Sequence, residues 1–171
     1  MKNLLISLFL VLSASSLLHA QEWTAIEYKY SNGPVSPAYQ KNYSVVISSD
    51  RYVRMTYTSY SNGSKSDSYS RRLSKGQMKS FNKILNASGF LASGYNPNFT
   101  DNMKVGGPSK AITISFSGDK KPLELNERLG DKSELEKFES LSAYIEKLIP
   151  SKVWKKFSAE KSKPKENTKS E

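Results

Sequence analysis

Several short segments of the chain alternate between apolar and polar residues, which is the pattern of half-buried β-strands. Residues 22–31 alternate first, and the same period recurs over residues 42–49 and 51–60. The residues predicted to share one face of each strand are Thr24, Ile26, Tyr28 and Tyr30, then Tyr43, Val45 and Ile47, and then Val53, Met55 and Tyr57. Asn62-Gly63 is a strong signal for a two-residue hairpin turn, so residues 64–72 are predicted to return as a fourth strand. That strand is polar, and we therefore expect it at an edge of the sheet.

A helix with a defined start and end follows these strands. Ser74 and Gln77 have the spacing of a capping box, in which each side chain bonds the other residue's backbone N–H. Gly89 is expected to end the helix, because glycine adopts the left-handed conformation without strain. Its apolar stripe consists of Met78, Phe81, Ile84 and Leu85.

The second half of the chain predicts two more strands and another helix. Residues 91–108 are rich in glycine and proline and predict a long irregular loop. Residues 110–117 and 121–126 alternate as strands around a turn. Residues 133–150 predict a helix that starts at a capping box completed by Glu136.

The predicted order of elements is β-β-β-β-α-β-β-α, which favours the α+β class. We expect one antiparallel sheet of about six strands, with two helices packed on one face. Trp154 and Phe157 predict one short further turn that caps the core, although residues 152–157, which mix lysines with aromatics, could instead lie at a membrane surface. Residues 158–171 predict a disordered basic tail.

The N-terminus has the layout of a secretory signal peptide over residues 1–20, with a short basic start, an apolar run and Ala20 before the cleavage point. Cleavage after Ser16 is the alternative. The apolar run is shorter than a membrane-spanning helix needs, and no later stretch is long enough. We therefore expect a cleaved, exported protein, periplasmic or extracellular, with a single α+β domain over residues 21–157 and no transmembrane segment in the mature chain.

Composition removes several kinds of chemistry. The chain has 171 residues, no cysteine and one histidine, His19, which lies in the predicted signal. The mature chain would thus lack thiolate zinc sites, disulfides, cysteine nucleophiles and histidine-based triads. No catalytic residue, cofactor or metal site is predicted. A hydrolase would have to use Ser80 with Lys83, or paired carboxylates. The acidic residues best placed to pair, which we interpret as solvated or capping groups, are Glu124, Glu127, Glu134, Glu136 and Glu139.

The net charge of +10 is unevenly distributed. Residues 21–110 hold 12 basic and 5 acidic side chains, whereas residues 111–150 hold 6 and 8. On the predicted hairpin 51–72, basic residues alternate with tyrosines. If these side chains share a face, they could bind a polyanion through charge and stacking; the alternative is a solvated sheet face with a protected edge. The possible ligand face consists of Arg51, Tyr52, Arg54, Tyr60, Lys65, Tyr69, Arg71 and Arg72.

Residues 28–39, with the sequence YKYSNGPVSPAY, are followed by Tyr43-Ser44-Val45. This tyrosine-rich strand and Gly-Pro-x-x-Pro-x-Tyr turn resemble a group of small exported bacterial proteins of unknown function. Those proteins look similar also in a helix-ending Ile-Pro, here Ile149-Pro150. The resemblance implies a bacterial cell envelope and brings no catalytic residues with it.

These features favour a non-enzymatic exported protein that binds a ligand or supports the envelope. Its partner is unknown and could be an anionic glycan, a lipid headgroup or an envelope protein. We expect no nucleic-acid partner, because an exported protein rarely meets nucleic acid. Besides the hydrolase and the polyanion binder, a further alternative is a protein inhibitor that inserts residues 31–41 or 91–108 into a partner's cleft.

Overall fold

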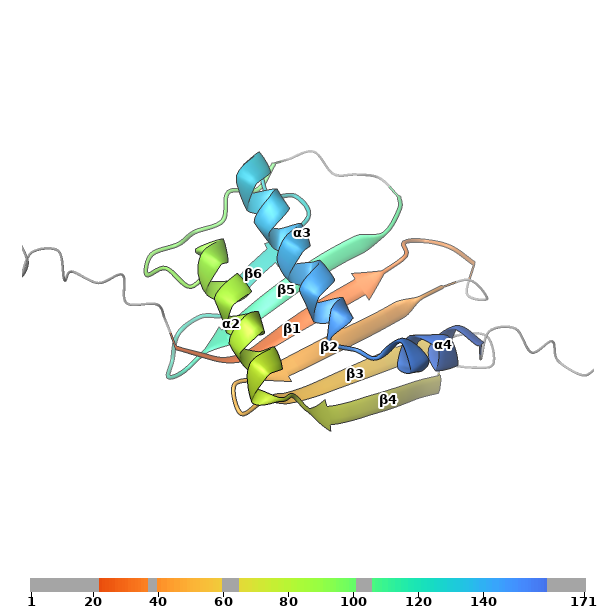
Figure 1. Ribbon diagram of the computed structural model, residues 1–171. Coiled ribbons are helices and arrows are strands. Elements are labelled where there is room, and N and C mark those ends of the chain that lie inside the picture. The colour runs from red at the N-terminus through yellow and green to blue at the C-terminus, as the bar shows by residue number, and fades with distance from the viewer. Residues whose placement is uncertain (1–21, 37–39, 60–64, 101–105, 160–171) are drawn as a thin grey trace, which may run out of the picture.

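The protein forms one open, six-stranded antiparallel sheet with helices on one face (Figure 1). The computed structural model describes residues 22–36, 40–59, 65–100 and 106–159. The spatial order of the strands is β4-β3-β2-β1-β5-β6. This architecture confirms the predicted α+β class. The strands are β1 (Trp23–Ser31), β2 (Asn42–Ser48), β3 (Tyr52–Ser59), β4 (Lys65–Arg72), β5 (Ser109–Phe116) and β6 (Leu123–Asn126).

Three helices cover the sheet: α2 (Lys75–Ser88), α3 (Lys132–Lys147) and α4 (Ser151–Ala159). Figure 1 shows all three on the same face, and the other face has no helix over it. The capping box of α2 is present as predicted, since the Ser74 side chain accepts from the Gln77 backbone and the Gln77 side chain accepts from the Ser74 backbone. Gly89 ends α2 in the left-handed conformation, with φ of 80°.

The start of α3 and the length of α4 differ from the prediction. The N-cap of α3 is Asp131, whose carboxylate accepts from the Glu134 backbone N–H at 3.0 Å. This earlier cap makes the predicted Ser133–Glu136 box unnecessary, because Ser133 already lies inside the helix. α4 is a nine-residue helix rather than one turn, and it extends to Ala159, past the predicted start of the tail.

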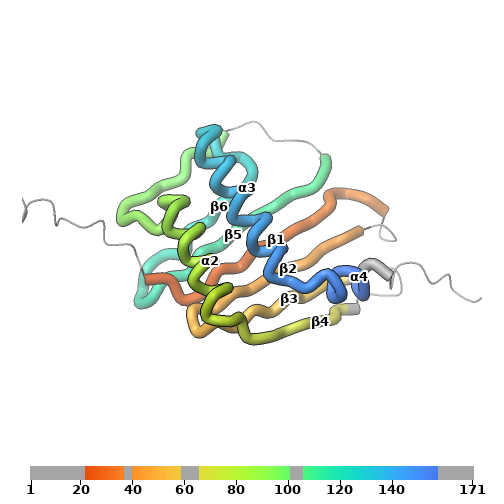
Figure 2. Tube along the Cα trace, viewed as in Figure 1, coloured from red at the N-terminus to blue at the C-terminus, as the bar shows by residue number. Residues whose placement is uncertain are grey.

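The path of the chain explains the order of the strands (Figure 2). β1 to β4 form a meander in which each strand lies beside the previous one. α2 then carries the chain back across the face, so that β5 pairs with the free side of β1. The hairpin signal Asn62-Gly63 and the signal peptide lie outside the described residues, although β3 and β4 do pair antiparallel as a hairpin requires.

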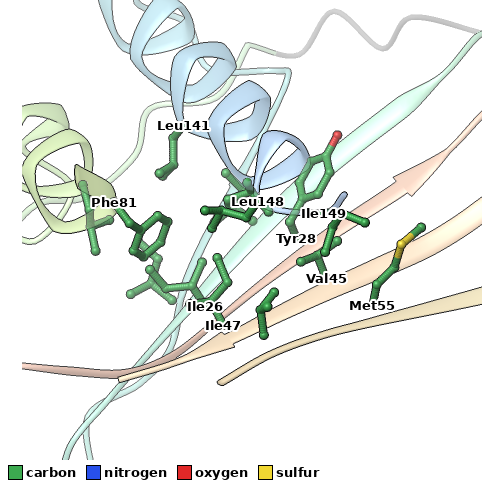
Figure 3. Close-up of a cluster of buried hydrophobic side chains, with 14 of the residues drawn as sticks. Ile26, Tyr28, Val45, Ile47, Met55, Phe81, Leu141, Leu148 and Ile149 are labelled. Atoms are coloured by element: carbon green, nitrogen blue, oxygen red, sulfur yellow. The ribbon is translucent and has the colours of Figure 1, made fainter. Parts of the chain in front are cut away.

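The hydrophobic core lies between the sheet and the helices. Strand side chains such as Ile26, Val45 and Met55 face Phe81 of α2 and Leu141 of α3 (Figure 3). Each of these five side chains is fully buried. Among the described residues, no helix is long and apolar enough to cross a membrane.

Candidate functional site

A row of three tyrosines crosses the helix-covered face near one end of the sheet. Tyr30 of β1 pairs in register with Tyr43 of β2, and Tyr43 pairs with Tyr57 of β3. Cross-strand partners share one face of a sheet, so the three side chains lie side by side. We call Tyr30, Tyr43 and Tyr57 the tyrosine row.

This row marks the place where the apolar core ends. Two residues further along the strands, the next row contains Ile112, Tyr28, Val45 and Met55, all fully buried. Figure 3 shows the ring of Tyr28 beside the aliphatic core, with its hydroxyl directed away from that core. The polar ends of the tyrosines therefore collect between the sheet and the ends of α3 and α4.

The tyrosine row forms the floor of a pocket of about 350 Å³. Two helices supply its walls, because Glu146 lies in the last turn of α3, and Trp154 and Phe157 belong to α4. The lining residues, which we call the tyrosine-row pocket, are Tyr30, Lys41, Tyr43, Tyr57, Lys110, Glu146, Trp154 and Phe157.

The aromatic rings of the pocket pack in fixed geometries. Tyr30 stacks on Tyr43 with ring centroids 4.8 Å apart, and Tyr57 stacks on Phe157 at 5.1 Å. Trp154 meets Tyr43 edge to face at 4.9 Å and an interplanar angle of 73°. Such offset and perpendicular contacts are the favoured arrangements of aromatic pairs. The pocket thus has two packed aromatic surfaces that lie nearly at right angles to each other.

Two tyrosines hold the carboxylate of Glu146. The hydroxyls of Tyr28 and Tyr43 donate to its Oε1 at 2.6 and 2.8 Å. Within the described part of the chain, no hydrogen bond is made to the other carboxylate oxygen, Oε2. The indole N–H of Trp154 donates to the backbone oxygen of Glu146 at 3.4 Å. Charge-assisted hydrogen bonds of this kind are strong, so the carboxylate is fixed in orientation.

The environment of these tyrosines raises their pKa values. For both Tyr28 and Tyr43, burial is the largest cause, and the hydrogen bond to Glu146 is the next. Burial penalises the charged phenolate, and the neighbouring carboxylate disfavours a second negative charge. Both hydroxyls therefore remain protonated donors at physiological pH, and Glu146 keeps its two partners.

Ion pairs close the two ends of the row. Lys110, the register partner of Tyr30, pairs with Glu139 of α3 at 2.6 Å. At the other end Asp67, the partner of Tyr57, pairs with Lys156 of α4 at 2.7 Å. Each pair joins a sheet residue to a helix, and exposed pairs of this type contribute little stability.

Two glycine-containing loops meet beside the tyrosine row. Asn32 and Lys41 close the loop between β1 and β2, since the Lys41 backbone N–H donates to Asn32 Oδ1 at 2.6 Å. Gly33 has a φ of 88°, and a Cβ at this position would overlap the backbone of Gly107. The loop that carries Lys41 therefore packs directly on the loop before β5, which places Lys41 and Lys110 at the same end of the sheet.

The predicted basic and tyrosine-rich residues do not share one face. Tyr52, Arg54 and Arg72 lie on the open face, because Tyr52 pairs with Arg72 and Arg54 pairs with Ser70 in register. Tyr69 and Arg71 lie on the helix-covered face, opposite Met55 and Val53.

The remaining members of that set are a turn residue and two residues whose side chains the structure does not describe. Arg51 occupies the turn between β2 and β3, with a φ of 75°. Tyr60 lies outside the described residues, and the side chain of Lys65 is not described. Among the members whose side chains are described, Tyr52, Arg54 and Arg72 share the open face, and Tyr69 and Arg71 lie on the opposite one.

Arg71 connects three elements rather than facing a ligand. Its guanidinium donates to the backbone oxygen of Leu148 at 2.7 Å and to Gln77 Oε1 at 3.2 Å. The first bond satisfies a carbonyl at the C-terminal end of α3, which has no partner within the helix.

We expect Arg71→Ala to lower the free energy of unfolding by about 2 kcal/mol, the size typical of hydrogen bonds to a charged group. Arg72→Ala, at the adjacent exposed position, is the matched control and should change it by less than about 0.5 kcal/mol. Urea denaturation of the two variants measures both values. Equal losses would contradict the structural assignment of Arg71.

Other hollows of the described part of the chain include two that compare with the tyrosine-row pocket in size. The larger, about 600 Å³, lies mainly over the open face and is lined largely by serine, threonine and asparagine side chains. The other, about 390 Å³, lies between the 90–99 loop and the ends of β5 and β6. Neither contains a carboxylate held by other side chains, and the tyrosine-row pocket is for this reason the better candidate. The described residues contain no cluster of three acidic side chains able to ligate a metal.

The sequence pattern placed the tyrosines on the inward face but did not identify the pocket. The sequence feature that could have pointed to the pocket is an inward tyrosine near one end of each of three strands, at Tyr30, Tyr43 and Tyr57. Their alignment depends on strand register, and Glu146 looked like one of many polar helix residues. Comparison of the sequence with models of known protein families and with curated proteins finds no match.

Proposed function

We propose that this protein is an exported, non-enzymatic binding protein whose ligand occupies the tyrosine-row pocket. The observation that carries the proposal is the Glu146 carboxylate, held by Tyr28 and Tyr43 in the wall of an aromatic pocket. Ligand sites are typically apolar pockets with a few well-placed polar groups. Export rests on the signal-peptide pattern of residues 1–20.

Binding explains the pocket better than hydrolysis does. Glu146 is the carboxylate among the described lining residues, whereas glycoside hydrolysis by the usual route needs two facing carboxylates. The two other acidic residues named at the ends of the row are engaged in ion pairs, Glu139 with Lys110 and Asp67 with Lys156. The hydroxyls of Tyr28 and Tyr43 both donate to Glu146. This carboxylate is therefore arranged as a fixed hydrogen-bond acceptor.

The test uses nuclear magnetic resonance of the ¹⁵N-labelled mature chain with the low-molecular-mass fraction of a bacterial envelope extract as the probe. We expect shifts at the indole N–H of Trp154 and at the backbone amides of Tyr30 and Tyr43, because a ligand in the pocket changes the ring currents there. Trp154→Ala should reduce the binding free energy by about 1 kcal/mol, which weakens binding about fivefold. The backbone shifts should fall by at least that factor.

Tyr52→Ala is the control variant. Tyr52 is an aromatic residue of the open face with 52% of its surface exposed. This variant should keep the full response at Tyr30 and Tyr43. The proposal fails if the shifts concentrate on the open face, if Trp154→Ala leaves them unchanged, or if the extract causes none.

A further inference from the structure

We propose that the ligand of the tyrosine-row pocket is a saccharide unit bearing a carboxylate, an inference that rests on the binding function proposed above. Its ring would pack on the aromatic residues, its hydroxyls would donate to Glu146, and its carboxylate would lie toward Lys41 and Lys110. Each part follows from a separate feature of the pocket.

The aromatic surfaces suit a ring with apolar C–H faces and polar edges. Tyr43 and Trp154 meet at 73°, so a ligand can lie against one ring while its edge contacts the other. The electron-rich face of an aromatic ring attracts the weakly positive C–H groups of a saccharide. A volume of about 350 Å³ is at the small end of the range for ligand pockets, which favours one or two sugar rings over a larger molecule.

Glu146 supplies an acceptor of the kind that recognises hydroxyl groups. Its Oε1 already accepts two tyrosine hydroxyls, so the carboxylate does not have to be ordered when the ligand binds. Oε2 has lone pairs for ligand hydroxyls, which would form charge-assisted hydrogen bonds. Because the acceptor is pre-oriented, the entropic cost of binding is reduced.

The charges around the pocket favour an anionic ligand over a cationic one. Lys41 and Lys110 line the pocket beside the carboxylate of Glu146. Glu139 offsets the charge of Lys110, so Lys41 contributes most of the preference for an anion. Lys110 bonds Glu139, and an ammonium has three donors, so it can also reach a second anion. An aromatic pocket with a carboxylate can also hold a quaternary ammonium ion, but here the two lysines would repel it.

The experiment compares three probes with similar rings: D-glucuronate, D-glucose and D-glucosamine. Dissociation constants are measured from amide shifts of the mature chain during titration. We expect glucuronate to bind about tenfold more tightly than glucose, which corresponds to about 1.4 kcal/mol, and glucosamine to bind most weakly. Added salt should reduce the preference for glucuronate, because Lys41 is exposed.

Lys41→Gln should bring the affinity for glucuronate close to the affinity of the same variant for glucose. Lys29→Gln is the matched control, because Lys29 is an exposed lysine of the open face and pairs with Glu27. It should preserve the preference.

Equal binding of glucuronate and glucose, tighter binding of glucosamine, or no effect of Lys41→Gln would overturn the inference. Absence of binding by all three saccharides would overturn it as well. None of these outcomes removes the binding function itself, because that is decided separately by the response of Tyr30 and Tyr43 to the envelope extract.

Discussion

Phe157→Ala is expected to lower the free energy of unfolding by about 3–5 kcal/mol, the range for removing a buried phenylalanine ring. Phe157 is 2% exposed and stacks on Tyr57, so it fixes α4 to the sheet. α4 has nine residues, too few to be stable as an isolated helix in water. Its helical structure therefore depends on this packing, and the wall of the tyrosine-row pocket depends on α4.

Urea denaturation measures this loss, and the fluorescence of Trp154 reports the state of α4 before global unfolding. In Phe157→Ala we expect the emission to shift to the red, because a released helix exposes the indole. Trp23 is buried in the core, so the comparison is best made in a Trp23→Phe background. Lys155→Ala, an exposed position on the same helix, is the control. A loss below about 1 kcal/mol for Phe157→Ala would show that α4 is not integral to the fold.

Above about pH 10, the protein is expected to lose stability because Tyr28 is buried against a carboxylate. The folded state holds the pKa of Tyr28 well above its usual value, mainly through burial and then through the bond to Glu146. In the unfolded chain the same hydroxyl ionises near pH 10. Above that pH the unfolded state binds fewer protons than the folded one, so the free energy of unfolding falls by about 1.4 kcal/mol per pH unit for this residue. Below pH 10 this contribution to stability is fully present.

The measurement is urea denaturation at several pH values from about 9 to about 12, a range that spans the tyrosine pKa. Tyr28→Phe should be less stable at neutral pH, because it loses a hydrogen bond to Glu146, yet its stability should fall less steeply at alkaline pH. Tyr52→Phe, at the exposed position on the open face, should retain the wild-type slope. If wild type and Tyr28→Phe have the same slope, the Tyr28 hydroxyl does not titrate with unfolding.

The local elements could be predicted because their signals lie within a few residues. The Ser74–Gln77 box and Gly89 define α2, and the alternation gives the inward face of β2, of β3 and of β1 from Ile26 onward. At the start of β1 a register shift buries Trp23 and leaves Thr24 exposed, opposite to the prediction. Local signals also compete, and here the sequence failed at α3. Asp131 and Ser133 are both suitable caps, and Asp131 forms the bond. The full length of α4 was missed because it depends on packing of Phe157 against Tyr57, not on a local cap.

Alternation within β4 already argues against a single basic-aromatic face that contains both Arg71 and Arg72. Arg71 and Arg72 are adjacent and therefore point to opposite sides of β4. Tertiary structure decides their roles, because Arg71 reaches Leu148, 77 residues away in the chain, whereas Arg72 is exposed. A count of charges along the hairpin adds together side chains that lie on opposite faces of the sheet.

The sequence by itself determined the α+β class, the order of the elements and the inward position of the tyrosines, because each follows from short-range periodicity. Tertiary structure alone decided that Tyr30, Tyr43 and Tyr57 form one row, since strand register aligns them across separate strands. It also decided that Glu146, 118 residues after Tyr28, is held above that row. Periodicity specifies which way a side chain faces, but only register and helix packing determine which side chains meet.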